Sequence, residues 1–173
     1  MNPPSLTNCL LKNIQEGVIM SQYINFFIRK QIKDEIAFIP IGSFSRSCHI
    51  YKAIIDAPYE KIRPLKYEEL NDIIRELHDS KREYENSIKD IEHTITNIIP
   101  SFNNSIEEKM QEIQQQRSYI ADISEDIVDI QFSIGYFCAL QEIIYDNSDS
   151  SPSKDEIIYC GIEVGCPTEE DVV

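Results

Sequence analysis

The 173-residue sequence has few glycines and none of the glycine-rich motifs that cradle phosphate groups. It contains five glycines in all, and no segment matches a P-loop or a dinucleotide-binding pattern. The H-E-x-x-H motif of zinc peptidases and the G-x-S-x-G motif of serine hydrolases are absent as well. These absences argue against the common nucleotide-dependent and hydrolytic enzymes, so we expect a protein without catalytic activity, cofactor or metal.

The cysteines form no metal-binding or disulfide pattern. There are five, an odd number, and they are widely spread with no C-x-x-C spacing: Cys9, Cys48, Cys138, Cys160 and Cys166. A disulfide framework or a zinc ribbon is therefore disfavoured. The one close pair, Cys160 and Cys166, is interpreted as a buried strand cysteine followed by an incidental loop cysteine.

Long apolar runs are also missing from the sequence. No segment shows the uninterrupted apolar stretch of about 20 residues that a membrane-spanning helix needs. The segment CLLKNIQEGVIM does not fit a signal peptide, because Lys12 and Glu16 interrupt its apolar residues. We therefore expect a cytoplasmic protein of a bacterial host that does not contact membranes.

Charge is unevenly distributed along the chain, whose net charge is −14. Residues 1–65 carry 8 basic and 5 acidic side chains, residues 66–141 carry 7 and 16, and residues 142–173 carry 1 and 9. The acidic part repels phosphate backbones, so direct binding of nucleic acid is disfavoured and a basic protein partner is favoured. The alternative is that acidity only keeps the protein in solution. The candidate partner-binding residues are Glu83, Glu85, Asp90, Glu92, Glu112, Asp122, Glu125 and Asp129.

Two segments near the N-terminus predict a β-hairpin. YINFFIR at 23–29 and IAFIPIG at 36–42 are rich in β-branched and aromatic residues, and a polar run separates them. Pro40 has no N–H to donate to a neighbouring strand, so the second strand is expected either to lie at a sheet edge or to end at Pro40. The segment that follows Gly42 then predicts one short helix with a serine cap, stopped by Pro58.

The next segment predicts a long helix with a coiled-coil seam. From Leu70 to Ile98 the apolar residues recur at alternating steps of four and three, with one polar interruption at Lys81. The helix is expected to end before Pro100, because proline cannot lie inside a helix.

A second, longer helix follows after a short loop. Ser105 and Glu108 fit a capping box at its start, and its own seam runs from Ile106 and Met110 to Ile144. The short loop favours an antiparallel pairing of the two helices. The last part of the second helix is its most apolar, and we expect it to pack on the base through Phe132, Tyr136, Phe137, Leu140 and Ile144.

Together these elements predict an α+β fold. A long antiparallel two-helix coiled-coil hairpin would stand on a small base of a three-stranded antiparallel sheet and one short helix. The predicted segments are a leader or disordered arm at 1–19, the β-hairpin and short helix at 20–65, the helical hairpin at 66–145, a linker at 146–155, a third strand joining the base at 156–165, and a flexible tail at 166–173.

The start of the chain raises its own question. Glu16 and Gly17 can be encoded by codons that form a bacterial ribosome-binding sequence shortly before Met20. We therefore expect translation to begin at Met20, with residues 1–19 as a leader. A genuine flexible arm that begins at Met1 is the alternative.

One cluster of small polar residues is a candidate anion contact. Ser43, Ser45, Arg46 and Ser47 lie where a predicted strand turns into a predicted helix, whose free N–H groups can bind an anion. The alternative is a serine-capped turn whose arginine pairs with acidic side chains. A catalytic dyad of Cys48 with the following histidine is disfavoured, because neighbouring side chains on a helix point about 100° apart.

Several segments of the chain resemble small proteins encoded in bacteriophage and prophage genomes of low-GC bacteria. The resemblance is carried by YINFFIR, FIPIGSFSRS, APYEKIRPL, SFNNSIEEKM and YCGIEVGCPTEED, and it covers most of residues 20–171. No activity is established for that group. The resemblance therefore implies a phage origin, and it supplies no catalytic residues.

Three functions follow from these observations. The first is a non-enzymatic protein that binds another protein, as an inhibitor of a host nuclease or defence complex. The second is an assembly protein that forms a homodimer or larger oligomer through the helical hairpin. It is suggested by apolar residues outside the seam, Ile73, Tyr119 and Val128, which a free hairpin would leave exposed. The third is a binder of a small anion or nucleotide at the turn from Ser43 to Arg46.

Overall fold

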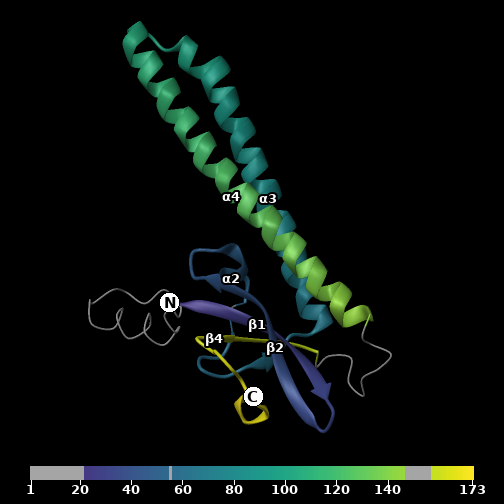
Figure 1. Cartoon of the computed structure of the whole chain (residues 1–173). Helices are drawn as coiled ribbons and strands as arrows, with labels where there is room; N and C mark the ends of the chain where they lie inside the picture. Colours follow the sequence, from purple (N-terminus) through teal and green to yellow (C-terminus); the bar gives the residue numbers. More distant parts are fainter. Residues whose placement is uncertain (1–21, 55, 147–156) are drawn as a thin grey trace, which may run out of the picture.

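The computed structural model describes residues 22–54, 56–146 and 157–173, and the fold is α+β (Figure 1). A four-stranded sheet and a short helix form the base, and two long helices pack side by side and extend from it. The leader predicted at 1–19 and all but the first residue of the linker predicted at 146–155 lie outside the described residues.

The sheet has four antiparallel strands in the order β2-β1-β4-β3. Strands β1 (Tyr23–Ile32) and β2 (Glu35–Ser45) form the predicted hairpin, and β4 (Ile158–Ile162) lies beside β1, as predicted for the third strand. The fourth strand, β3 (Arg63–Pro64), was not predicted. It has two residues, too few to produce an alternating pattern in the sequence.

Strand β2 is an edge strand, as Pro40 predicted. Phe26 pairs with Gly42 and Phe27 pairs with Pro40, so Ile41 is an extra residue that forms a β-bulge. Proline is tolerated at an edge and next to a bulge because no neighbouring strand needs its N–H.

The short helix α2 (His49–Ala53) is shorter than the segment predicted for it. Its N-cap residue is Cys48, and no side chain of its own segment caps it, so the predicted serine cap was wrong. The N–H of its first residue, His49, instead donates to the carboxylate of Asp129, a distant residue in the sequence.

The hairpin consists of α3 (Tyr67–His93) and α4 (Ile106–Asp146), which run antiparallel (Figure 1). A π turn, η1 (Thr94–Ile98), and a 3-10 turn, η2 (Ile99–Ser101), end the first helix. The predicted capping box is present at the start of α4. The Ser105 N–H donates to Glu108 Oε2 at 2.9 Å, and the Glu108 N–H donates to Ser105 Oγ at 3.2 Å.

The π turn changes which residue of α3 faces α4 near the tip of the hairpin. Ile98 is the predicted seam residue, but it is 39% exposed, and Ile99 is buried in its place. A π turn holds one more residue than an α-helical turn, so the buried position moves by one along the chain.

The first turn of α4 also differs from the predicted seam. Ile106 and Met110 are 78% and 66% exposed, although both were predicted to face α3. The half-buried residues at this end of α4 include Lys109, Glu112 and Ile113. Two large apolar side chains near the tip therefore face solvent.

The main core lies between the sheet, α2, the first turns of α3 and the C-terminal half of α4. Ile73 belongs to this core, so its predicted exposure was wrong, whereas Tyr119 and Val128 are exposed as predicted. The predicted packing of α4 on the base is confirmed for its most apolar part, because Phe137, Leu140 and Ile144 are buried. At the margin of this core, the Phe132 ring contacts Phe44 but is 56% exposed.

The last residues of the chain are held against the base, so the predicted flexible tail was wrong. The side chains of Thr168 and Asp171 cap a short 3-10 helix, η3 (Glu169–Asp171). The Ile62 N–H donates to Asp171 O at 2.9 Å, and the Val173 N–H donates to Ile62 O at 3.0 Å.

By length and composition, α4 can cross a membrane, contrary to our expectation from the sequence. A single helix of this kind is weak evidence, because the core helix of a soluble protein meets the same criteria. Several apolar residues of α4 contribute to the core described above, although only 28% of its most apolar 18-residue window is buried.

Arg63 joins β3 to α3 through a fork of ion pairs. Its Nη1 and Nη2 donate to the two Glu69 carboxylate oxygens at 3.0 and 2.6 Å, and Nη2 also donates to Asp56. We expect Arg63→Met to lower the free energy of unfolding by about 1–2 kcal/mol, because a largely buried bidentate pair is lost. Urea denaturation followed by circular dichroism measures this change.

The matched control is Arg75→Met on the surface of α3. Arg75 pairs with Asp72 at 2.8 Å, but both side chains are mostly exposed, and such pairs contribute less than about 1 kcal/mol. If the two variants lose equal amounts of free energy of unfolding, the ion pairs of Arg63 do not stabilise the base more than an exposed surface pair does.

Candidate functional site

Three side chains able to take part in acid–base or nucleophilic chemistry, Cys48, His49 and Asp129, come together where α2 packs on α4. Asp129, on α4, accepts a hydrogen bond from the His49 N–H at 2.9 Å, and its carboxylate contacts His49 Nδ1 at 2.6 Å. The Cys48 thiol donates to the other carboxylate oxygen at 3.6 Å. One carboxylate therefore binds the first residue of α2 twice and its N-cap residue once.

The electrostatics of this site favour a charged carboxylate and a neutral thiol. Burial alone would raise the pKa of Asp129, but the hydrogen bonds from the His49 N–H and ring outweigh it and hold that pKa below its usual value. Burial raises the pKa of the Cys48 thiol, and the neighbouring Asp129 charge raises it further. A reactive cysteine needs the opposite shift.

This arrangement is a structural clamp and not a nucleophilic site. In a cysteine triad the thiol pairs with the imidazole, whereas here the thiol and the imidazole Nδ1 both bind Asp129. The sequence argument against a dyad of Cys48 and His49 missed their shared partner. Asp129 lies 80 residues after His49, and no local pattern indicates such a pairing.

Asp129→Asn tests the clamp through the pH dependence of stability. A carboxyl whose pKa is lower in the folded protein stabilises it above the unfolded pKa, and this contribution is lost as the pH falls through the folded pKa. Asp129 is partly exposed, so we expect a loss of only about 1 kcal/mol at pH 5. As the pH falls below the ordinary Asp pKa of about 3.9 towards the lower pKa of the folded protein, the difference in the free energy of unfolding between wild type and variant should decrease.

The control for this experiment is Asp122→Asn, at an exposed position on the same helix. It should change the free energy of unfolding little at either pH. The free energies of unfolding of Asp129→Asn and wild type could instead differ by the same amount at pH 5 and at pH 3. That result would contradict the lowered pKa of Asp129.

The predicted anion contact lies next to this clamp. Ser43 is in β2, Ser45 Oγ and Ser47 Oγ are 2.8 Å apart, and the Arg46 N–H donates to Gln22 O at 2.9 Å. The helix that follows has five residues, and its first N–H already donates to the Asp129 carboxylate. The chain thus supplies its own anion at the helix start where an external anion was predicted to bind.

The predicted partner-binding residues are divided between solvent and internal contacts. Glu83, Glu85, Asp90, Glu92, Asp122 and Glu125 are exposed on the two helices. Glu112 is half-buried and accepts a hydrogen bond from Gln116 at 2.9 Å. Asp129 belongs to the clamp, so six of the eight residues are presented to solvent. Among these six, Glu85 forms an ion pair with Lys81 at 3.6 Å.

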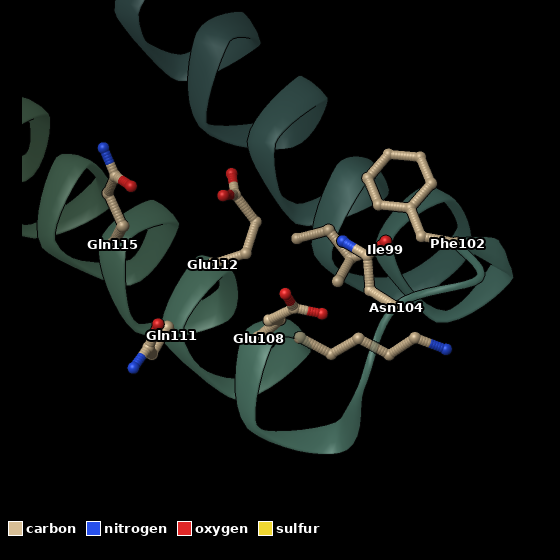
Figure 2. Close-up of a pocket in the computed structure, with 8 residues that line it drawn as sticks. Ile99, Phe102, Asn104, Glu108, Gln111, Glu112 and Gln115 are labelled. Carbon is tan, nitrogen blue, oxygen red and sulfur yellow. The ribbon is translucent and has the colours of Figure 1, made fainter.

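A cleft of about 310 Å³ lies at the tip of the hairpin (Figure 2). Ile99 and Phe102 form its apolar side, and Glu108, Glu112 and Gln115 line it from α4. The Glu108 carboxylate is already used in the capping box. Within the described ranges, no group of three His, Cys, Asp or Glu side chains is placed to hold a metal ion.

Comparison of the chain with models of protein families, with curated proteins and with solved structures finds no match in any of the three.

Proposed function

We propose that the chain is a non-enzymatic protein of phage origin that binds a basic protein through the acidic side chains of its helical hairpin. The observation that supports this proposal is the exposure of six carboxylates on two helices packed against each other. Such helices hold the backbone positions of these side chains fixed, so little backbone conformational entropy is lost when a partner binds.

The partner that fits best carries a basic groove. With 27 residues at 1.5 Å each, α3 alone is about 40 Å long, and carboxylates project from it and from α4. A groove that binds nucleic acid attracts such a surface, because it is lined by basic side chains. We therefore propose a host nuclease or defence complex as the target, with its nucleic-acid groove occupied by the hairpin.

The test uses charge reversal on the hairpin. The tagged full chain is used to capture proteins from bacterial lysate, in parallel with the fourfold variant Glu83→Lys, Asp90→Lys, Glu92→Lys and Asp122→Lys. We expect a basic nucleic-acid-binding protein to be captured by wild type and lost with the variant. Double-stranded DNA added to the lysate should compete for the same partner.

A second fourfold variant provides the matched control. Asp34→Lys, Glu35→Lys, Glu60→Lys and Glu170→Lys change the net charge by the same amount, at exposed positions of the base. This variant should retain the partner. Equal loss of binding with both variants would indicate a dependence on net charge and would contradict the proposed surface.

An assembly protein is the second candidate. It is favoured by a specific observation, the apolar side chains exposed on α4, of which Val128 and Met110 are 68% and 66% exposed. An acidic surface does not account for them. Their arrangement on one side of α4 suggests a second copy of this chain as the partner.

A further inference from the structure

The face of α4 that carries these apolar side chains is continuous along the helix. It consists of exposed residues at steps of three or four, which lie on one side of an α-helix. We call it the outer stripe, and its residues are Met110, Gln114, Arg117, Ala121, Ser124, Glu125, Val128 and Phe132. The opposite side of α4 holds the half-buried and buried residues that face α3 and the base.

The outer stripe differs from the rest of the hairpin in charge. Residues 66–141 have a net charge of −9, but the outer stripe contains one arginine and one glutamate and is neutral. A second copy of this chain would be repelled by most faces of the hairpin, because like charges would oppose each other. A second copy can approach the outer stripe without this repulsion between like charges.

The outer stripe is also complementary to itself when it is reversed. Ala121 lies at its centre, with Met110 and Phe132 eleven residues to either side, and Arg117 and Glu125 four residues to either side. Two such helices placed antiparallel about Ala121 therefore bring Met110 to Phe132 and Arg117 to Glu125 of a second copy, while Val128 faces Gln114. A two-fold interface requires this kind of self-complementary surface.

Arg117 and Glu125 are available for this pairing. Both side chains are exposed, and none of the ion pairs between described residues includes either of them. At the centre of the stripe, Ala121 is small enough to let two helix backbones come close together.

We propose that two copies of the chain pair through their outer stripes, antiparallel and two-fold symmetric about Ala121. In this dimer Arg117 forms an ion pair with Glu125 of the partner subunit, and Met110 packs on Phe132 of the partner subunit. The inference does not depend on the proposed basic target, because the outer stripe shares only Glu125 with the six exposed carboxylates and leaves the other five for that target.

The first experiment measures the oligomeric state of the full chain by analytical ultracentrifugation over a dilution series. Wild type is expected to be a dimer that dissociates on dilution. Ala121→Glu places two negative charges together at the two-fold axis, so we expect dimer affinity to fall by at least about tenfold. Ser87→Glu adds the same charge at an exposed site on α3 and should leave the affinity unchanged.

The second experiment exchanges the charges of the proposed ion pair. Arg117→Glu and Glu125→Arg should each weaken the dimer, since each opposes like charges across the interface. The double variant restores opposite charges at both ends and should recover most of the affinity. Circular dichroism of each variant separates a loss of dimer from a loss of folding.

Three results would overturn the proposal. The first is a wild-type chain that is monomeric at every concentration reached. The second is a dimer that Ala121→Glu leaves unchanged, because it would use another surface. The third is a double charge exchange no better than the single variants, because Arg117 would then not face the partner's Glu125.

Discussion

Replacing Phe26 by alanine is expected to lower the free energy of unfolding by about 3–5 kcal/mol. Phe26 is fully buried in β1, and its ring makes edge contacts with Phe44, Tyr136 and Phe137, at centroid distances of 6.0, 5.4 and 6.4 Å. These partners come from β2 and α4, so the substitution leaves a cavity between the sheet and the hairpin. The whole stability of a domain this size is about 5–15 kcal/mol, so much of it would be lost.

Urea denaturation followed by circular dichroism measures the change, with Phe102→Ala as the matched control. Phe102 lies at the hairpin tip and is 45% exposed, so the same truncation should cost less than about 1 kcal/mol there. Phe26→Leu retains part of the buried volume, so its free energy of unfolding should lie between those of wild type and Phe26→Ala. Similar losses for Phe26→Ala and Phe102→Ala would mean that the sheet and α4 do not share a core at Phe26.

The second large effect is expected at Gly161, where a methyl group has no space. A Cβ atom built on Gly161 would lie within van der Waals overlap of the Lys61 carbonyl oxygen and 2.9 Å from Val164 Cγ2. The first neighbour is backbone and cannot rotate away, so β4 or the segment before β3 has to shift. We expect Gly161→Ala to lower the free energy of unfolding by about 2–3 kcal/mol, in the upper part of the range for overpacking.

Gly165→Ala is the control for Gly161→Ala. No atom lies within 4 Å of a Cβ atom built there, so the substitution should be neutral or slightly stabilising. Thermal denaturation of both variants under the same conditions gives the comparison. An unchanged melting temperature for Gly161→Ala would show that the two segments are not in the close contact described.

The elements that sequence predicted correctly are those fixed by local patterns. The two long helices follow from apolar residues repeated over many turns, and the Ser105 and Glu108 capping box follows from a spacing of three residues. The edge position of β2 follows from the missing N–H of Pro40. Each of these signals depends only on residues close in sequence, so it does not depend on contacts with distant parts of the chain.

The features that sequence missed depend on contacts between distant residues. The C-terminal residues have no periodic pattern, and their order comes from hydrogen bonds to Ile62. The exposure of Ile98 depends on a π turn, which a heptad pattern does not indicate because it assumes equal turns. Strand β3 exists because β4 passes beside it.

The same distinction between local patterns and distant contacts applies to the candidate sites. The acidic residues of the hairpin could be placed on exposed helix faces from their spacing, and six of them are exposed. The pairing of Asp129 with the start of α2 could not be anticipated, since it needs the base and the hairpin to be folded against each other. The same contact removes Asp129 from the surface that a partner could bind.

The place of β4 in the sheet has a consequence for the order in which the chain folds. Strand β1 begins at residue 23, but one of its two neighbours begins at residue 158, after the whole hairpin has been synthesised. The helices pair through contacts that are closer in sequence, and such contacts form faster than distant strand pairings. On the ribosome, the hairpin is therefore expected to be complete while the base is still an unfinished sheet, with the β4 side of β1 uncovered until β4 emerges.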